Sequence, residues 1–324
     1  MGIILVCIAL VFTSPKEDLF TIGLLFLVLN FFAATQDIGV DGFAVDILEE
    51  KEMGPGNSAQ ISGFKLGNLC GGGILLALSG YIGWKGNFIA MLLIILCAML
   101  LFSLSNEKKL RAQKTQPNTN NQNQQVLKKL LKALKEQGLS FWAFILFVKF
   151  GETFGGIMVK PMLIDQKISL PSIGILDGII GAVATILGGI SGGIICRKKG
   201  WHKCLMIFSP LQGLALVAYG IYSTMNVTVY GAGIINAFEN FCGGCVGVSI
   251  FSLAMSRCSK EIGASQFTAS QVIYMLGGYL ASPLAGFFAE HFTYLPVMAL
   301  GGVLAMLVSP LALKMYKKQE LISA

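Results

Sequence analysis

Long apolar runs, separated by short polar segments, dominate the pattern of this chain. Each run approaches or exceeds the roughly 20 residues that an α-helix needs to cross the hydrocarbon core of a bilayer. The runs cover residues 19–47, 59–83, 86–105, 140–163, 171–196, 203–223, 228–256, 265–289 and 294–315, after a shorter apolar start at 1–12. They lack the alternation that is typical of a transmembrane barrel. The pattern therefore predicts an all-α polytopic membrane protein with about ten transmembrane helices.

Composition agrees with this class. Of the 324 residues, 54% are hydrophobic and only 13% are charged, whereas a soluble domain carries about 25% charged residues. The cysteines are scattered, mostly in or beside apolar runs, which predicts buried thiols and no metal or cofactor. Cys242 and Cys245 form a CxxC pair, but two glycines separate them and no second pair follows. We expect this pair to serve helix packing.

Basic residues alternate between loops in a way that predicts orientation. The loops 49–58, 106–138, 197–203 and 257–261, together with the tail, hold 18 of the 24 lysines and arginines. Since positive residues gather on the cytoplasmic side, the C-terminus and the loop 106–138 are predicted to be cytoplasmic. This dispersed charge fits lipid headgroups as partners and argues against nucleic acid. The membrane stays open: endoplasmic reticulum or plasma membrane in a eukaryote, inner membrane in a bacterium.

A polar segment divides the chain into two parts. Residues 1–105 are expected to form an incomplete N-terminal bundle of four spans, and 139–324 a six-helix C-terminal bundle. Between them, the linker 106–138 is rich in asparagine and glutamine, which predicts partial disorder. The tetrapeptide at 51–54 is echoed at 260–263 in a matching position. This echo predicts two parallel repeats, with roughly two helices of the first repeat expected ahead of residue 1.

One helix of the first half carries acids inside the membrane. Asp37 and Asp41 are four residues apart and share one helix face. Such charges cost several kcal/mol unless they face a wet cavity or a partner. Lys65, at equal depth in the next span, is the predicted partner of Asp41, in a switch or in a structural pair. Asp37 and its neighbour Gln36 are then the candidates for meeting substrate or proton, and Asp46 is expected at the cytoplasmic gate.

The second half carries its own polar points. Lys149 and Glu152 are three residues apart, so that they share a helix face near mid-bilayer. They either neutralise each other or line the transport pathway, and the sequence leaves both interpretations open. Asp177, Glu239 and Asn240 lie in other spans, where a packing network and a pathway are again both possible.

Two glycine-rich segments are expected at the cytoplasmic ends of helices. Gly54, Gly56 and Asn57 lie in a stretch that predicts a turn between two cavity-lining helices. Arg197 and Lys198 follow a run of small residues, and we expect them to anchor the next cytoplasmic turn. Both segments are candidates for a gate.

Several of these motifs resemble one family. The stretches are Gln36-Asp37-x-x-x-Asp41, Gly54-Pro55-Gly56-Asn57, Lys65-Leu66-Gly67 and Lys149-x-Gly151-Glu152. They resemble the acetyl-CoA transporter branch of the major facilitator superfamily. The same acidic helix and Gln266-Phe267-Thr268 are similar to bacterial muropeptide permeases of the AmpG type.

The resemblance implies a two-bundle fold of twelve helices, of which the first two are expected to be missing here, and secondary transport by alternating access. It implies an anionic acyl or nucleotide-like solute such as acetyl-CoA, coupled to protons, with anhydro-muropeptide as the alternative. Lys65 and Lys149 would then attract the anion, and Asp37 or Glu152 would take up the proton. A non-transporting receptor or scaffold, or an inactive truncated carrier, is the alternative of another class. An enzyme is not expected, since the chain has no phosphate-cradling glycine-lysine motif and no nucleophile with a base.

Overall fold

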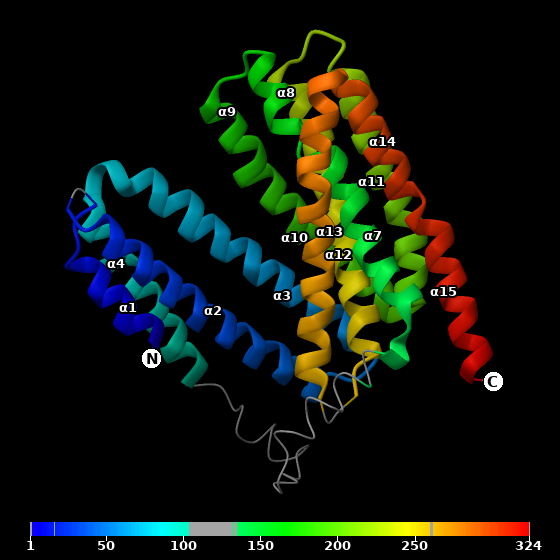
Figure 1. The fold of residues 1–324 in the computed structure, drawn as a ribbon, viewed down its shortest axis with the longest axis horizontal. Coiled ribbons are helices and arrows are strands. Elements are labelled where there is room, and N and C mark those ends of the chain that lie inside the picture. The colour runs from blue at the N-terminus through cyan, green and yellow to red at the C-terminus, as the bar shows by residue number, and fades with distance from the viewer. Residues whose placement is uncertain (1, 16, 104–131, 133–134, 260–261, 324) are drawn as a thin grey trace, which may run out of the picture. The chain divides into compact units, whose positions relative to one another are not determined.

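The chain folds into helices in the part that the structure describes. This computed structural model describes all residues except 1, 16, 104–131, 133–134, 260–261 and 324, which Figure 1 draws in grey. The described residues form helices and no strands, which confirms the predicted all-α class. They divide into two compact units, Met1–Ile47 with Leu66–Gln122, and Leu48–Lys65 with Asn123–Ala324.

The first unit is built from three apolar helical segments. These are α1 (Gly2–Val11), α2 (Leu19–Ile47) and α4 (Leu75–Ser103), with the π-helical turn η1 (Leu69–Ile74) leading into α4. Two helices within α4 meet at Gly83, whose φ of 65° is open to glycine at little cost. Leu10, Ile22 and Phe88 form the core, and the Trp84 indole donates to the Leu10 carbonyl at 3.1 Å.

The second unit is a helical bundle. Its elements are the first part of α3 (Met53–Asn68), α7 (Leu139–Gly156), α8 (Val159–Asp165), α9 (Leu170–Gly174), the π-helix η2 (Ile175–Gly181), α10 (Ala182–Lys199), α11 (Trp201–Tyr222), α12 (Val229–Ser256), α13 (Gly263–His291), α14 (Tyr294–Met306) and α15 (Val308–Ser323). The helix α10 packs on α12, α7 packs on α13 and α14, and α11 packs on α12 and α14. Figure 1 shows these long helices side by side.

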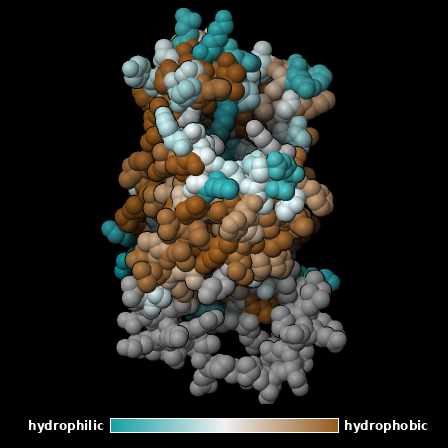
Figure 2. Space-filling model, turned by 90° about the vertical axis from the view of Figure 1, so that its left-hand side faces the viewer, coloured by the Kyte–Doolittle hydropathy of each residue, from teal (hydrophilic) through white to brown (hydrophobic). Residues whose placement is uncertain are grey.

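Eight helices among the described residues are long and apolar enough to cross a membrane. The predicted number was about ten, and the difference has two causes. The helix α1 has only 10 residues, and the 16 residues of α3 are too polar to count as a span. Large apolar side chains such as Phe20, Tyr81 and Leu139 are exposed, as expected of surfaces that face lipid. Figure 2 shows brown, hydrophobic atoms over most of the visible face.

Small residues bring α10 and α12 into close contact. A Cβ atom on Gly188 would lie 1.9 Å from the Phe241 carbonyl oxygen, and one on Gly244 would lie 2.3 Å from the Thr185 carbonyl oxygen. Glycine is therefore required at both positions, because any side chain would push the two backbones apart. This contact fixes the wall on which the cavity described below is built.

The segment with Gly54 and Gly56 is helical and not the turn that we expected. The helix α3 begins at Met53, so that both glycines and Pro55 lie in its first turn. Proline is tolerated there, because the first amide groups of a helix have no partner within the helix. The turn that connects α2 to α3 is correspondingly short.

Tertiary contacts explain why these residues adopt a helix. A Cβ atom on Gly54 would lie 2.7 Å from the Gly193 carbonyl oxygen. Asn57 is fully buried, and its amide nitrogen lies 3.5 Å from the Ser252 hydroxyl and 3.2 Å from the Met255 sulfur. The start of α3, which precedes the linker in sequence, is thus packed on α10 and α12 within the second unit.

Two sequence predictions fall on residues outside the described part. Most of the linker 106–138 is one of them, and Lys260 and Glu261 of the repeated tetrapeptide are the other. Arg197 and Lys198 lie in the last turn of α10, which Gly200 ends with a φ of 83°. Their role as a gate stays a prediction.

Cys258 lies in the loop between α12 and α13, and the burial of its thiol can be tested. Burial raises the pKa of the Cys258 thiol to about 12, so that the reactive thiolate is scarce below that pH. We expect maleimide to label Cys258 about a hundredfold more slowly at pH 7.5 than a thiol at the exposed neighbour Ser259. Labelling rates of two single-cysteine variants, Cys258 alone and Ser259→Cys alone, measure the ratio. Equal rates at neutral pH would contradict the burial.

Candidate functional site

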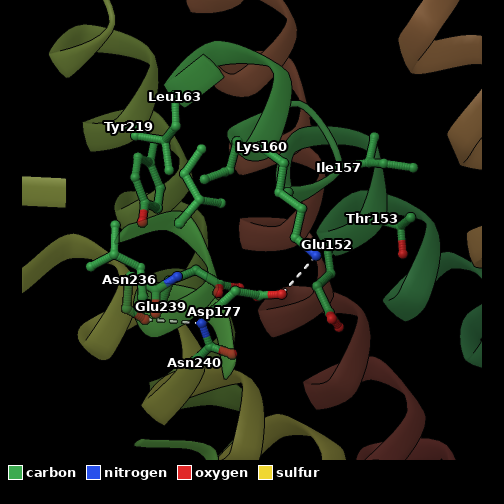
Figure 3. Close-up of a pocket in the computed structure, with 14 residues that line it drawn as sticks. Glu152, Thr153, Ile157, Lys160, Leu163, Asp177, Tyr219, Asn236, Glu239 and Asn240 are labelled. Carbon is green, nitrogen blue, oxygen red and sulfur yellow. Dashed lines mark hydrogen bonds and ion pairs between the residues drawn. The ribbon is translucent and has the colours of Figure 1, made fainter. Parts of the chain in front are cut away.

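A cavity of about 320 Å³ opens within the second unit. It lies among α7, α8, α9, η2, α11 and α12, so that every wall belongs to one unit (Figure 3). Its charged and amide side chains are Glu152, Lys160, Asp177, Asn236, Glu239 and Asn240. A concave site with a few convergent polar groups inside an apolar bundle is where small molecules bind.

An ion pair between Lys160 and Asp177 lies on one side of the cavity. Lys160 is in the second position of the short helix α8, and Asp177 is in the π-helix η2. The Lys160 ammonium lies 2.6 Å from the Asp177 carboxylate, and the side chains are 61% and 50% exposed. Because the pair is half-exposed, each charge remains available to a solute that enters the cavity.

A second ion pair lies within α7. The Lys149 ammonium lies 2.5 Å from the Glu152 carboxylate, and it also lies 5.5 Å from the ring centre of Tyr274. The side chains are only 24% and 22% exposed. The two charges therefore neutralise each other, and Glu152 also lines the cavity. A role of the pair in a transport pathway stays a prediction.

The helix α12 contributes the third group of polar side chains. Glu239 accepts a hydrogen bond from the amide of Gln212 at 3.1 Å. Asn240 donates to the carbonyl oxygen of Asn236 at 3.0 Å, and its own amide oxygen accepts from the Thr185 hydroxyl at 3.3 Å. Three polar residues at helical spacing thus face the cavity from one helix.

The sequence predicted some of these residues and missed others. Glu152, Asp177, Glu239 and Asn240 were candidates, and the structure brings all four to one cavity. Lys160 was missed, because its charge was counted as a topological signal of an outer loop. Further missed residues are Asn236 and Tyr219. Asn236 carried a usable signal, since it lies three and four positions before Glu239 and Asn240 and so shares their helix face.

The candidates of the first half lie elsewhere. Gln36, Asp37, Asp41 and Asp46 all belong to α2 in the first unit. Asp41 is 7% exposed and buried, whereas the other three are exposed. Lys65 belongs to the second unit, so that its predicted pairing with Asp41 stays a prediction.

Glu239 has an amide as its close partner and, within the described part of the chain, no close cation. Its carboxylate accepts a hydrogen bond from Gln212. Among the described residues, no ion pair joins Lys65 or Lys149 to Glu239.

The cavity suits the binding of a polar solute better than bond chemistry. It presents carboxylates, one lysine and two amides, most of them already engaged with a partner in the protein. Within the described part of the chain, no group of three histidine, cysteine, aspartate or glutamate side chains could hold a metal ion. A ligand that enters the cavity can replace the protein groups to which these side chains now bond.

Substitution of the half-exposed pair tests this interpretation. We expect Lys160→Met to change the free energy of unfolding by less than about 1 kcal/mol, because exposed ion pairs contribute little. Uptake of the solute should nevertheless fall roughly tenfold, since a charged contact to the ligand is lost. Thermal unfolding and an uptake assay measure the two effects. Lys167→Met, outside the cavity, is the control, and equal uptake by both variants would contradict a role for Lys160.

Comparison with known families adds a second kind of finding. The sequence profile of the Major Facilitator Superfamily matches residues 1–281. The anhydromuropeptide permease of Escherichia coli is 30% identical over 295 residues, which are 89% of this chain and 59% of the permease. Putative transporter AmpG 3 of Rickettsia prowazekii is 26% identical over 94% of this chain and 74% of its own length. The chain thus spans about three fifths of the length of the Escherichia coli permease.

These relatives favour one of the two expected branches. The Escherichia coli relative is named an anhydromuropeptide permease and the Rickettsia relative a putative AmpG transporter, and neither is named as an acetyl-CoA transporter. The expected likeness to acetyl-CoA transporters, and within them to major facilitator superfamily domain-containing protein 3, has no support from these names. The alternative drawn from Gln266-Phe267-Thr268 and the acidic helix is the better supported interpretation.

Proposed function

Because the chain belongs to the major facilitator superfamily, we propose that it acts as a secondary transporter for sugar-peptide solutes of the muropeptide kind. Transport would proceed by alternating access, as rocking of two bundles exposes the solute site to one side of the membrane and then to the other. The name of the Escherichia coli relative, an anhydromuropeptide permease, supports the solute class. Multi-pass membrane insertion is already evident from the eight spans of the described residues.

The mixed charge of the cavity is the observation that carries this proposal. Its lining includes three carboxylates, of which Glu152 and Asp177 are each paired with a lysine, whereas Glu239 has no close cation among the described residues. A solute such as acetyl-CoA presents several phosphate charges, for which the described lining of the cavity offers no lysine that is free of a carboxylate partner, and Glu239 would repel them. A sugar-peptide carries hydroxyl, amide, ammonium and carboxylate groups, each of which finds a complementary group in such a cavity.

Proton coupling belongs to the proposal as well. Asp37 in the first unit and Glu152 in the second are the carboxylates for which the sequence suggests this role. A carboxylate at bilayer depth can change its protonation with its surroundings, which suits a relay. Uptake that depends on an inward proton gradient, and that Asp37→Asn makes independent of pH, would support Asp37 in this role.

Direct transport measurement tests the function. We expect proteoliposomes with the full-length protein to accumulate labelled anhydromuropeptide and not labelled acetyl-CoA. Excess unlabelled muropeptide should compete, whereas excess acetyl-CoA should not. Accumulation of acetyl-CoA alone would overturn the proposed solute class, and binding of either without accumulation would favour the receptor alternative.

A further inference from the structure

A buried amide oxygen without a hydrogen-bond partner among the described residues lies on the α12 wall of the cavity. Asn236 is only 7% exposed, and its side-chain oxygen is buried without a hydrogen-bond partner. A buried amide oxygen left unpaired costs about 1–3 kcal/mol, so that such a group is stable only if something compensates it. Because Asn236 lines the cavity, a bound solute is in a position to supply the missing donor.

Glu239 lies beside this oxygen, one helical turn further along α12. Its carboxylate has two oxygens, and the bond from Gln212 engages one of them, Oε1. The other cavity carboxylates each have a lysine within 2.6 Å, namely Lys149 for Glu152 and Lys160 for Asp177. Within the described residues, Glu239 is thus the cavity carboxylate that lacks a close cation.

The two acceptors together require a particular kind of donor. A primary ammonium carries a positive charge and three N–H groups, so that it can bond a carboxylate and an amide oxygen at once. A hydroxyl offers a single donor and no charge, and it would leave Glu239 uncompensated. The pair of acceptors therefore fits an ammonium group best.

A complementary charge lies on the facing side of the cavity. Figure 3 shows Lys160 reaching in from α8, with Asn236 and Glu239 on α12 and Asp177 between them. Since Lys160 is 61% exposed and its ammonium has three N–H donors, it can bond a carboxylate of the solute while it keeps its pair with Asp177. The cavity then presents an anionic wall and a cationic wall to one small molecule.

We propose that Asn236 and Glu239 form a subsite for the primary ammonium of a zwitterionic, amino-acid-like group, with Lys160 receiving the carboxylate of the same solute. The assignment rests on the proposed function, in that this group is the peptide part of the sugar-peptide solute. The subsite means that this bundle recognises the peptide part of the solute, and that recognition depends on the free amine of the peptide.

A simpler interpretation is that Glu239 is satisfied within the protein. Gln212 is its hydrogen-bond partner. This interpretation accounts for Glu239 but leaves the buried oxygen of Asn236 unexplained. It also predicts no preference for an amine, which makes the two interpretations separable.

Binding to the purified full-length protein separates them. The probes are anhydromuropeptide with its amine free, the same compound N-acetylated, and the dipeptide alanyl-alanine with its N-acetyl form. We expect acetylation to weaken binding about tenfold or more in the wild-type protein, because a charge-assisted contact is lost. In Glu239→Gln the preference should fall below about threefold, and in Asn236→Ser it should fall part of the way. Glu290→Gln, an exposed acid on α13, is the matched control and should retain the full preference.

The outcomes are distinct. If neither muropeptide form binds but the dipeptide binds with a Glu239-dependent preference for the free amine, the proposed function fails and the ammonium subsite stands. If wild-type protein shows no preference, or if Glu239→Gln keeps it, the subsite is overturned. Should Glu239→Gln fail to fold, a full preference retained in Asn236→Ser overturns the subsite equally.

Discussion

Gly188→Ala should strongly lower the thermal stability of the protein, although it adds a single methyl group. The new Cβ atom would lie 1.9 Å from the Phe241 carbonyl oxygen, and that oxygen belongs to backbone that cannot swing aside as a side chain can. Overpacking of this kind costs about 3 kcal/mol at the upper end of its usual range. The corresponding fall in the midpoint of thermal unfolding is roughly 6–12 °C.

The measurement is thermal unfolding of the detergent-solubilised full-length protein. It is monitored as the fraction of the protein that stays monodisperse after heating. Gly174→Ala, earlier in the same span, is the matched control, because nothing lies within 4 Å of its added Cβ atom. Gly174→Ala should match the wild type within about 1 kcal/mol. An unchanged midpoint for Gly188→Ala would show that α10 and α12 are not held as closely as described.

Lys149→Met should impair both stability and transport. It leaves the Glu152 carboxylate without the ammonium that lies 2.5 Å away, in side chains only about a fifth exposed. Removing one partner from a buried pair costs about 3–5 kcal/mol, which partial exposure lowers to about 2–3 kcal/mol here. Because Glu152 lines the cavity, we also expect uptake to fall at least tenfold.

A double-variant cycle shows whether the pair itself is responsible. Lys149→Met with Glu152→Gln removes both charges, so that stability should recover most of what either single change loses. Transport should remain low, since the cavity has still lost a carboxylate. Additive losses of stability in the double variant would mean that the two residues act independently, against the observed pair.

The sequence alone predicted the fold class, because helices that insert into a membrane have a strong apolar pattern. Apolar runs of spanning length indicate helices, since backbone polar groups in lipid must bond within their own segment. The boundaries of α3 could not be predicted in this way. Gly54, Pro55 and Asn57 have the local character of a turn, and only their contacts with α10 and α12 make a helix favourable.

The candidate site was predicted in part for a similar reason. Intramembrane charge marked Glu152, Asp177 and Glu239, because such residues are costly wherever they lie. The sequence did not indicate a role for Lys160, since a lysine near the end of a span is interpreted as a signal of membrane orientation. The predicted partner of Asp41 depended on equal depth alone, and depth cannot say which helices are neighbours.

The docking of the start of α3 on α10 and α12 has a consequence for synthesis. Gly54 leaves the ribosome about 140 residues before Gly193, with which it packs, and at 5–20 residues per second the interval is on the order of ten seconds. Throughout that interval the Asn57 amide has none of its later partners on α12. We expect this helix to enter the bilayer late, held at the insertion machinery until its partners emerge. This polar helix is thus synthesised early but is among the last to reach its final position.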